Sequence, residues 1–266
     1  MSVLIVIPAR YASTRYPGKP LVTLRGAGGT AKTLIRRSWD AAMAVQGVDR
    51  VVVATDAGSI RAEAESFGAE VVMTSPECAN GTERCAEALA TLGGGYDIVV
   101  NLQGDAPLTP AWFVEELIAG LRADPQAELA TPVLRCEGAM LSSLRADRAA
   151  GRVGGTTAVF GVGNRGLYFS KEVIPYTGRD YAPEAPTPVF HHVGVYAYRP
   201  DTLLAYPGWP VGPLETLEGL EQLRFLENSR RVLCVEVEAR GRQFWELNNP
   251  TDVPRIEAMM AAMGLQ

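Results

Sequence analysis

The chain has few of the residues that mark metal-binding and disulfide-rich proteins. Its 266 residues include two histidines and four cysteines, with no CxxC pair and no histidine at zinc-ligand spacing from a cysteine. Neither a cysteine-histidine zinc site nor a disulfide framework is therefore expected. We predict instead that Cys78, Cys85, Cys136 and Cys234 are ordinary reduced thiols in or near the core.

Long apolar runs and an excess of positive charge are also missing. The run VLIVI at 3–7 is far too short for a membrane span or a signal-peptide core, and no later run approaches the roughly 18 apolar residues of a spanning helix. A formal charge of −5 argues against a general nucleic-acid binder, which needs a basic face to displace counterions from phosphates. We therefore expect a cytoplasmic protein without membrane or nucleic-acid partners, in which any anion site is local.

Short apolar runs alternate with helical patterns along the first half. Because 47% of the residues are hydrophobic, the chain can bury a substantial core. Unbroken β-branched runs predict buried parallel strands, and the spacing of apolar residues predicts helices between them. The strands are expected at 3–7, 50–56, 70–74 and 97–105, and the helices at 31–46, 58–67, 83–92 and 110–122. Further strands are expected at 128–136, 156–160, 166–170, 191–199 and 232–238, a surface loop at 181–188 and a helix at 214–228.

A basic, turn-rich loop, PARYASTRYPGKP at 8–20, follows the first predicted strand directly. Ligands of open α/β sheets bind beyond the carboxyl ends of the strands, where this loop must lie. Backbone N–H groups, helped by Gly18 and by the cations Arg10, Arg15 and Lys19, can hold phosphate oxygens there. The loop matches neither of the two common phosphate-binding motifs. A merely solvated surface loop is the alternative interpretation.

A second loop places an acid at the same edge of the predicted sheet. In VVNLQGDAP at 99–107, Gln103 and Asp105 stand where a buried strand ends in a turn. Carboxylate oxygen beside a polyphosphate suits Mg²⁺, which prefers hard oxygen ligands and commonly shares them with substrate phosphates. Alternatively, Asp105 only caps its own backbone in the turn. Taken together, the two loops favour a site for a nucleotide and a metal ion.

Seven motifs then follow one another along nearly the whole chain: PARYASTRYPGKPL, VATD, NGTER, NLQGDAPL, LYFSKEVIP, HHVGVYAYR and LEQLR. In this order and at about this spacing they resemble the CMP-Kdo synthetases, the 3-deoxy-manno-octulosonate cytidylyltransferases. The resemblance implies one domain over 1–266 with a three-layer α/β/α nucleotidyltransferase (Rossmann-like) fold and a mostly parallel central sheet. Residues 1–125 would mainly bind nucleotide, and 126–266 would mainly bind sugar and form a homodimer.

The same resemblance implies CMP transfer from CTP to an acidic 2-keto-3-deoxy sugar, with Mg²⁺ required and pyrophosphate released, for lipopolysaccharide or capsule synthesis. The implied catalytic residues are Arg10, Lys19 and Asp105, and the implied metal ligands are Asp105 and Asn248. The implied nucleotide-binding residues are Pro8, Ala9, Arg10, Ser13, Arg15, Lys19, Thr82 and Arg84. The implied sugar-binding residues are Gln103, His192, Tyr196, Glu221 and Gln222.

Several of these assignments have structural alternatives. His192 could be a hydrogen-bonded core residue, either Tyr196 or Tyr198 could simply pack, and Glu221 could lie on the solvated side of a helix. The metal site has a second candidate as well. If FWELN at 244–248 is extended, Glu246 lies on the same face as Asn248 and could replace it as a ligand.

The chain also departs from the family pattern at three places. Thr157 stands at a usual lysine, Asn248 stands where a second magnesium-binding aspartate is expected, and the segment GAGGTAKT at 26–33 is longer and richer in glycine. These departures leave three hypotheses. The chain activates Kdo; or it transfers CMP to another acceptor, such as amino-Kdo, a sialic-acid-like sugar or a phosphonate; or it binds nucleotide without turnover.

Overall fold

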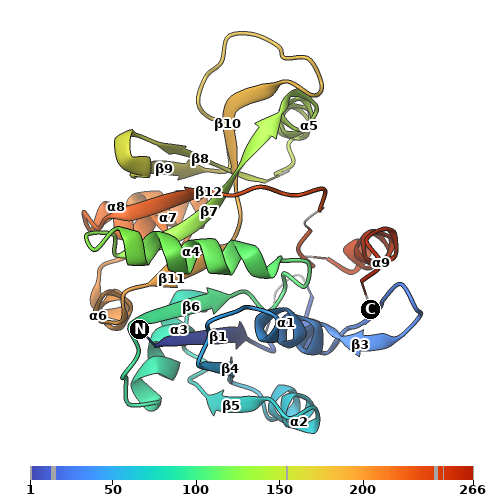
Figure 1. Ribbon diagram of the computed structural model, residues 1–266, viewed down its shortest axis with the longest axis vertical. Coiled ribbons are helices and arrows are strands. Elements are labelled where there is room, and N and C mark those ends of the chain that lie inside the picture. Colours follow the sequence, from blue (N-terminus) through green and yellow to red (C-terminus); the bar gives the residue numbers. More distant parts are fainter. Residues whose placement is uncertain (1, 13–15, 154, 243–244, 248, 266) are drawn as a thin grey trace. The chain divides into compact units, whose positions relative to one another are not determined.

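The computed structural model describes residues 2–12, 16–153, 155–242, 245–247 and 249–265, and Figure 1 shows their course. The chain forms two compact units, which are described one at a time. The first unit comprises Met1–Glu115, Arg199–Pro207 and Arg240–Gln266, and the second comprises Glu116–Tyr198 and Gly208–Ala239. Segments 199–207 and 240–266, which fall in the second predicted half, thus return to the first unit.

The first unit is built on a parallel sheet with the strand order β5-β4-β1-β6. Its strands are β1 (Val3–Ala9), β4 (Arg50–Thr55), β5 (Glu70–Met73) and β6 (Ile98–Leu102). All seven residues of β1 are buried, which explains its unbroken apolar sequence, because helices of the unit pack against it. The helices following the strands are α1 (Leu34–Met43), α2 (Gly58–Ser66) and α3 (Gly81–Thr91). The predicted succession of strands and helices is confirmed here.

Residues 23–33 form a hairpin, so 31–33 is a strand rather than the start of a helix. Strands β2 (Thr23–Arg25) and β3 (Ala31–Thr33) pair antiparallel, and α1 begins only at Leu34, after Thr33 caps it by accepting a hydrogen bond from the Arg36 N–H. The predicted helix 31–46 is therefore wrong over its first three residues. The carboxyl-terminal helix α9 (Val253–Ala262) packs on β2, preceded by the 3-10 helix η4 (Pro250–Asp252). Their shared core is Leu24, Leu34, Leu108, Leu247, Ile256 and Met260.

The second unit has a mainly antiparallel sheet with the order β11-β7-β10-β8-β9, and β12 pairs parallel with β7. The strands are β7 (Leu129–Glu137), β8 (Thr156–Phe160), β9 (Gly166–Ser170), β10 (Pro186–His192), β11 (Val195–Tyr198) and β12 (Val232–Glu236). The predicted single strand 191–199 is wrong, because β10 and β11 pair with β7 in different registers on either side of Val193 and Gly194. The predicted loop 181–188 ends earlier, since β10 begins at Pro186.

The helices of the second unit include two short ones where a single long helix is predicted. Helix α7 (Pro213–Glu218) ends at Gly219, whose φ of 60° is left-handed, and α8 (Leu223–Glu227) follows after a short turn. A continuous helix over 214–228 is therefore wrong. Sequence patterns also miss α5 (Gly138–Ala149) and, in the first unit, α6 (Pro200–Ala205) and the 3-10 helix η3 (Tyr206–Gly208). Helix α4 (Ala111–Ala123) begins in the first unit and ends in the second, as predicted for 110–122 within one residue.

Candidate nucleotide and sugar sites

The carboxyl ends of β1 and β6 lie against each other in the first unit because residue 104 has no side chain. A Cβ on Gly104 would lie 2.7 Å from the carbonyl oxygen of Pro8, closer than such atoms approach. The turn carrying Gln103 and Asp105 can therefore sit directly beside Pro8 and Ala9, both buried at the end of β1. This close approach brings the two predicted loops to one edge of the sheet, as expected.

An ion pair links the two loops. Lys19, the first residue of the 3-10 helix η1 (Lys19–Leu21), places its Nζ 2.5 Å from Oδ2 of Asp105, and the side chains are 14% and 28% exposed. The loop leading to Lys19 closes on itself, since the Gly18 N–H donates to the Tyr11 carbonyl at 3.0 Å with a left-handed φ of 68°. Arg10 is exposed at the end of β1, and Ser13 and Arg15 lie outside the described residues.

The Glu246 segment lies alongside the Asp105 turn. The N–H of Leu247 donates to the backbone carbonyl of Asp105 at 3.0 Å. Glu246 directly precedes Leu247 in the chain and is therefore adjacent to this contact. Asn248 falls outside the described residues. Within the described ranges, no group of three or more His, Cys, Asp or Glu side chains is arranged to hold a metal ion. Magnesium needs no such group, because it commonly takes one or two carboxylates and completes its coordination with substrate phosphates and water, so Asp105 fits this role.

Arg84 lies at the start of α3 and is engaged inside the protein. Its guanidinium pairs with Oδ2 of Asp56 at 3.0 Å and donates to Oγ1 of Thr74 at 2.5 Å, and the arginine is almost wholly buried. Oδ1 of Asp56 in turn accepts from the N–H of Tyr11 at 3.3 Å. Arg84 therefore supports the 8–20 loop through Asp56. Asp56 is not among the predicted site residues, although it follows a buried strand of the sheet just as Asp105 does.

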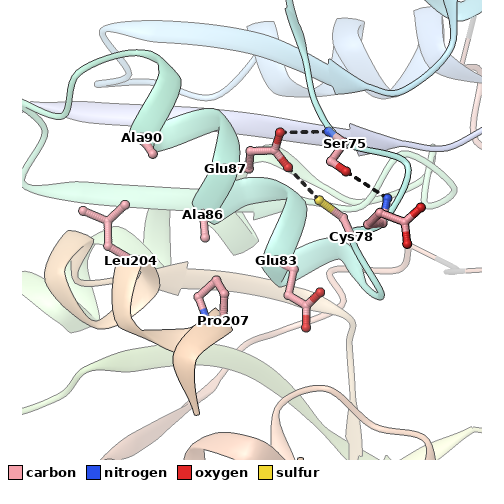
Figure 2. A pocket seen from close by; sticks show the side chains of 9 residues that line it. Ser75, Cys78, Glu83, Ala86, Glu87, Ala90, Leu204 and Pro207 are labelled. Atoms are coloured by element: carbon pink, nitrogen blue, oxygen red, sulfur yellow. Dashed lines mark hydrogen bonds between the residues drawn. The ribbon is translucent and has the colours of Figure 1, made fainter. Parts of the chain in front are cut away.

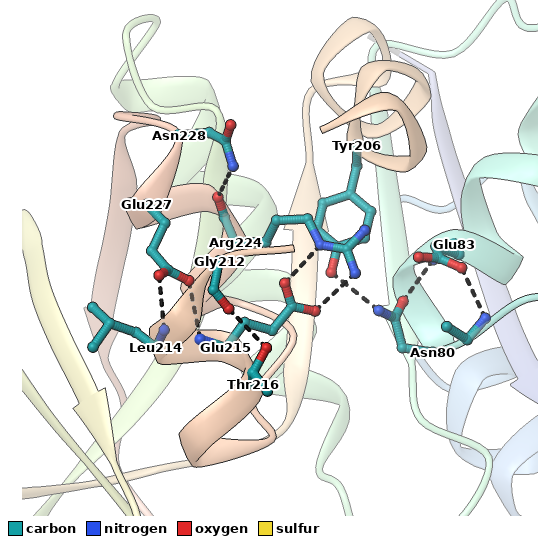
Figure 3. A network of polar contacts seen from close by, with 11 residues as sticks. Asn80, Glu83, Tyr206, Gly212, Leu214, Glu215, Thr216, Arg224, Glu227 and Asn228 are labelled. Carbon is teal, nitrogen blue, oxygen red and sulfur yellow. Dashed lines mark hydrogen bonds and ion pairs between the residues drawn. The ribbon is translucent and has the colours of Figure 1, made fainter. Parts of the chain in front are cut away.

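The first turn of α3 is fixed by side-chain caps (Figure 3). Oδ1 of Asn80 accepts from the Glu83 N–H at 2.9 Å, the Glu83 carboxylate accepts from the Ala79 N–H at 2.8 Å, and Nδ2 of Asn80 donates to the Tyr206 hydroxyl at 3.1 Å. Thr82 is buried in this turn. Gln103 faces the same turn, since a Cβ on Gly81 would lie 3.1 Å from its Nε2. The NGTER motif and the Asp105 turn are therefore neighbours.

A pocket of the first unit is lined in part by α3, and none of the predicted site residues lines it (Figure 2). Its thiol, Cys78, donates to Oε2 of Glu87 at 3.0 Å, and the other oxygen of Glu87 accepts from the Ser75 N–H at 2.8 Å. Burial and then the Glu87 carboxylate raise the pKa of Cys78 to about 12, so the thiol stays protonated. All four cysteines are free thiols; Cys85, Cys136 and Cys234 are buried, and Cys78 is partly exposed.

In the second unit His192 and Tyr196 stand on one face of the sheet. Their ring centroids are 5.7 Å apart, and Phe169 contacts the imidazole edge-to-face at 5.0 Å. Nε2 of His192 lies 2.8 Å from Oγ1 of Thr131. Because that hydroxyl donates to the Val195 carbonyl at 2.9 Å, we assign the Nε2–H tautomer. Burial, reinforced by the neighbouring His191, lowers the pKa of His192 to about 3, so the imidazole is neutral.

Tyr196 joins this group to Gln222 at the start of α8. The Tyr196 hydroxyl donates to Oε1 of Gln222 at 3.1 Å, and Gln222 is 1% exposed. Its Nε2 is buried and has no hydrogen-bond partner in the part of the chain that the structure describes. Glu221 precedes it in the same turn. Tyr198 packs on Phe225 with ring centroids 5.8 Å apart, and both tyrosines are buried.

Comparison with known proteins identifies the family of the chain. A family model described as cytidylyltransferase matches residues 4–232. The 3-deoxy-manno-octulosonate cytidylyltransferase of Maricaulis maris (strain MCS10) is 46% identical over 99% of both chains. The chain belongs to the 3-deoxy-manno-octulosonate cytidylyltransferase family. The predicted family and its enzyme class, the CTP-dependent nucleotidyltransferases, are thereby confirmed.

Two further relatives bear on fold and acceptor. The solved structure of a CMP:2-keto-3-deoxy-manno-octonic acid synthetase complexed with CTP has a TM-score of 0.83 at 32% identity, covering 99% of this chain and 100% of that one. It confirms the predicted α/β nucleotidyltransferase fold. An 8-amino-3,8-dideoxy-manno-octulosonate cytidylyltransferase of Shewanella sp. (strain W3-18-1) is 37% identical over 98% of this chain and all of the relative. Proteins of this similarity therefore carry names with two different sugar acceptors.

Proposed function

We propose that this cytidylyltransferase transfers CMP from CTP to 3-deoxy-manno-octulosonate, giving CMP-Kdo and pyrophosphate. Relatives named for this reaction support the acceptor, among them one that is 46% identical over 99% of the chain. The observation that carries the chemistry is the ion pair of Lys19 with Asp105 at the carboxyl edge of a parallel sheet. A cation for phosphate oxygens and a carboxylate for a metal ion are held there at one point.

The triphosphate is bound by the 8–20 loop. Arg10 and Lys19 supply positive charge from the described part of the loop, Ser13 and Arg15 are predicted contacts from the rest of it, and Pro8 and Ala9 end the strand that presents it. Arg84 acts through Asp56 and the Tyr11 N–H. The loop is thus held from both ends, since Lys19 anchors the other end on Asp105. Preorganised charges of this kind need little rearrangement as charge develops on the phosphates.

Magnesium is the metal that the donor set fits. Asp105 would hold it, with Glu246 or Asn248 as the second protein ligand and substrate oxygens as the rest. When bound, the ion would neutralise charge on the phosphate oxygens and on the departing pyrophosphate.

We expect the sugar acid to contact His192, Tyr196, Glu221 and Gln222 of the second unit, and Gln103 is a further predicted contact. His192 is neutral, because burial lowers its pKa to about 3, so it contributes hydrogen bonding or shape and no positive charge. The buried Nε2 of Gln222 is a donor for a hydroxyl or carboxylate oxygen of the acceptor. A buried donor that lacks a partner costs about 1–3 kcal/mol, which a bound oxygen offsets.

The reaction is an in-line displacement that positioning and charge can drive. The oxygen of the anomeric hydroxyl forms a bond to the α-phosphorus, the bond from that phosphorus to the bridging oxygen breaks, and pyrophosphate leaves with the electron pair. The hydroxyl proton passes to solvent or to the departing phosphate. No covalent protein intermediate is required, so neither a nucleophilic residue nor a thiol such as Cys78 takes part.

The proposal also covers where the protein acts in the cell and how it assembles. CMP-Kdo would serve lipopolysaccharide or capsule synthesis in the cytoplasm. Among the described helices, none is both long and apolar enough to cross a membrane. A homodimer formed by the second unit is supported by exposed apolar side chains there, among them Val162, Leu167 and Leu217. Sedimentation velocity at micromolar concentration tests this, with a monomer of 28.6 kDa as the contrary result.

A pyrophosphate-release assay tests the function directly. The purified protein, Mg²⁺ and CTP are incubated with Kdo, with its 8-amino analogue or with a sialic acid, and UTP replaces CTP in a parallel series. We expect turnover with Kdo and CTP, and a kcat/KM at least tenfold lower with UTP, because a pocket built for an amino group leaves polar groups unpaired against a carbonyl. Preference for the 8-amino sugar would reassign the acceptor, and comparable use of UTP would refute cytidylyl transfer.

A further inference from the structure

The turn that carries Glu221 and Gln222 is bounded by two helices too short to be stable alone. Helix α7 has six residues and α8 has five, whereas isolated helices below about 12 residues are marginal in water. The left-handed Gly219 between them provides a change of direction but no side-chain contact. Some other interaction must therefore fix how the turn is presented.

Reciprocal carboxylate contacts join the two helices (Figure 3). Arg224 of α8 donates from Nε and Nη2 to the two oxygens of Glu215 in α7, at 2.7 and 2.8 Å. In the other direction Glu227 of α8 accepts from the N–H groups of Leu214 and Glu215 in the first turn of α7, at 2.8 and 3.0 Å. Two contacts in opposite directions leave the helices little freedom to rotate about the turn.

The burial of this pair sets it apart from the surface ion pairs of the unit. The side chains of Arg224 and Glu215 are 3% and 10% exposed, whereas those of the similarly bidentate pair Arg135–Glu236 are each 43% exposed. A buried pair is costly to break, because each charge would remain without its partner in a poorly solvated place. Gly212 is adapted to the same arrangement, since a Cβ there would lie 2.2 Å from the Glu227 carboxylate.

Gln222 lies two residues before Arg224, and its amide is held from a second side by Tyr196. Helix α8 is itself seated on the sheet by Phe225, which is fully buried and stacked on Tyr198. The side-chain NH₂ of Gln222 is thus aimed by a fixed backbone and one hydrogen bond, with its own donors unsatisfied within the described chain. A donor contributes to binding when its orientation is fixed, since a misplaced donor loses most of its hydrogen-bond energy.

We infer that Glu215 and Arg224 are positioning residues for the sugar acid, acting through Gln222. This inference rests on the proposed function. It differs from a merely structural role in one respect: breaking the pair weakens recognition of the acceptor more than that of CTP. Glu227, by capping α7, supports the same presentation from the other helix.

The test uses a double variant, because Arg224→Met alone leaves Glu215 buried without its partner and could prevent folding. Glu215→Leu with Arg224→Met removes both charges and keeps similar volumes, a replacement that buried ion pairs commonly tolerate. Arg224→Lys keeps the charge but loses the two-pronged geometry. Arg135→Met, in the exposed pair of the same unit, is the matched control.

In the folded double variant we expect the KM for the sugar acid to rise at least tenfold, while the KM for CTP stays within about twofold of the parent value. The factor of ten corresponds to the loss of one well-oriented hydrogen bond of about 1.4 kcal/mol. Arg224→Lys should give a smaller rise, and Arg135→Met none. An unchanged KM for the sugar acid in the folded double variant would overturn the inference, as would equal rises in both KM values.

A second readout needs no turnover, so that failure of the proposed function stays distinguishable. The side-chain amide of Gln222 is observed by ¹⁵N NMR and assigned by its loss in Gln222→Glu. We expect its signals to shift or broaden in the folded double variant and to stay in place in Arg135→Met. Unmoved signals would refute the positioning role even if the parent transferred CMP to no sugar acid, an outcome that would refute the proposed function by itself.

Discussion

Two adjacent histidines, the buried His192 and the partly exposed His191, make the stability of the protein depend on pH. Desolvation lowers the pKa of His192 to about 3 and that of His191 to about 4, and for His192 the neighbouring His191 adds to the effect. An unfolded histidine has a pKa of about 6.5. Below this pH the unfolded chain therefore binds more protons than the folded one. The contribution of the histidines to the free energy of unfolding is fully present above about pH 6.5 and is lost as the pH falls toward the pKa values of the folded protein.

The size of the effect follows from these values. Going from about pH 7.5 to about pH 5 stabilises the unfolded chain by about 2 kcal/mol for each histidine that stays neutral in the fold. His192 is 6% exposed and should contribute the full amount of about 2 kcal/mol. His191 is partly exposed and should contribute less, so about 4 kcal/mol is the upper limit for the two histidines together. A loss of this size is a large fraction of the 5–15 kcal/mol by which proteins are typically stable.

Urea unfolding followed by circular dichroism, at several pH values between about 5 and 8, measures this dependence. His192→Gln should reduce the slope of the free energy of unfolding against pH by about half, and the double change His191→Gln with His192→Gln should nearly abolish it, whatever each does to stability at neutral pH. A parent protein that loses less than about 1 kcal/mol over this range, or a double variant that keeps the parent slope, would refute the reasoning.

The remaining predictions concern the nucleotide site. Lys19→Ala should lower kcat/KM for CTP at least tenfold with an unchanged circular dichroism spectrum, since a charge-assisted contact contributes about 1.5–3 kcal/mol; unchanged CTP kinetics would contradict the loop assignment. Asp105→Asn should abolish turnover, and Asn248→Asp should lower the Mg²⁺ concentration for half-maximal rate; full activity in Asp105→Asn would refute the metal assignment. For Glu246→Gln, a raised Mg²⁺ requirement in the same titration identifies Glu246 as a ligand, and an unchanged one excludes it. Gly104→Ala should lower kcat without unfolding the protein, because its Cβ would meet the Pro8 carbonyl at 2.7 Å and displace Asp105; kinetics equal to the parent would show that the turn can adjust.

The sequence was most informative where local pattern and long-range packing agree. Parallel strands inside a sheet are buried on both faces and need unbroken apolar residues, so β1, β4 and β6 could be predicted within a few residues of their observed ends. The carboxyl ends of such strands share one edge, and this alone predicted that the 8–20 loop and the Asp105 turn meet there. The ion pair of Lys19 with Asp105, at 2.5 Å, was found only in the structure. The motifs also sufficed for the family, which the comparison with the Maricaulis maris relative confirms.

Patterns failed where a single residue interrupts an otherwise regular segment. Leu and Phe recur at helical spacing over 214–228, but Gly219 adopts a left-handed conformation and divides the segment into α7 and α8. Likewise 191–199 alternates like one strand, yet its register on β7 changes at Val193 and Gly194. Helical and strand periodicity describe which face is buried, and they carry no information on whether the backbone continues through one residue.

Side-chain partners were decided only by the tertiary structure. The sequence marks Arg84 as a nucleotide-site residue, but only the fold shows it buried against Asp56 and Thr74, 28 and 10 residues away in the chain. It marks His192 as a polar ligand, but its neutrality depends on burial beside Phe169 and Thr131, which come from other strands. The residue types that the chemistry requires can thus be identified from the sequence. Their charge state, aim and support depend on desolvation and on contacts between distant segments, which exist only once the chain has folded.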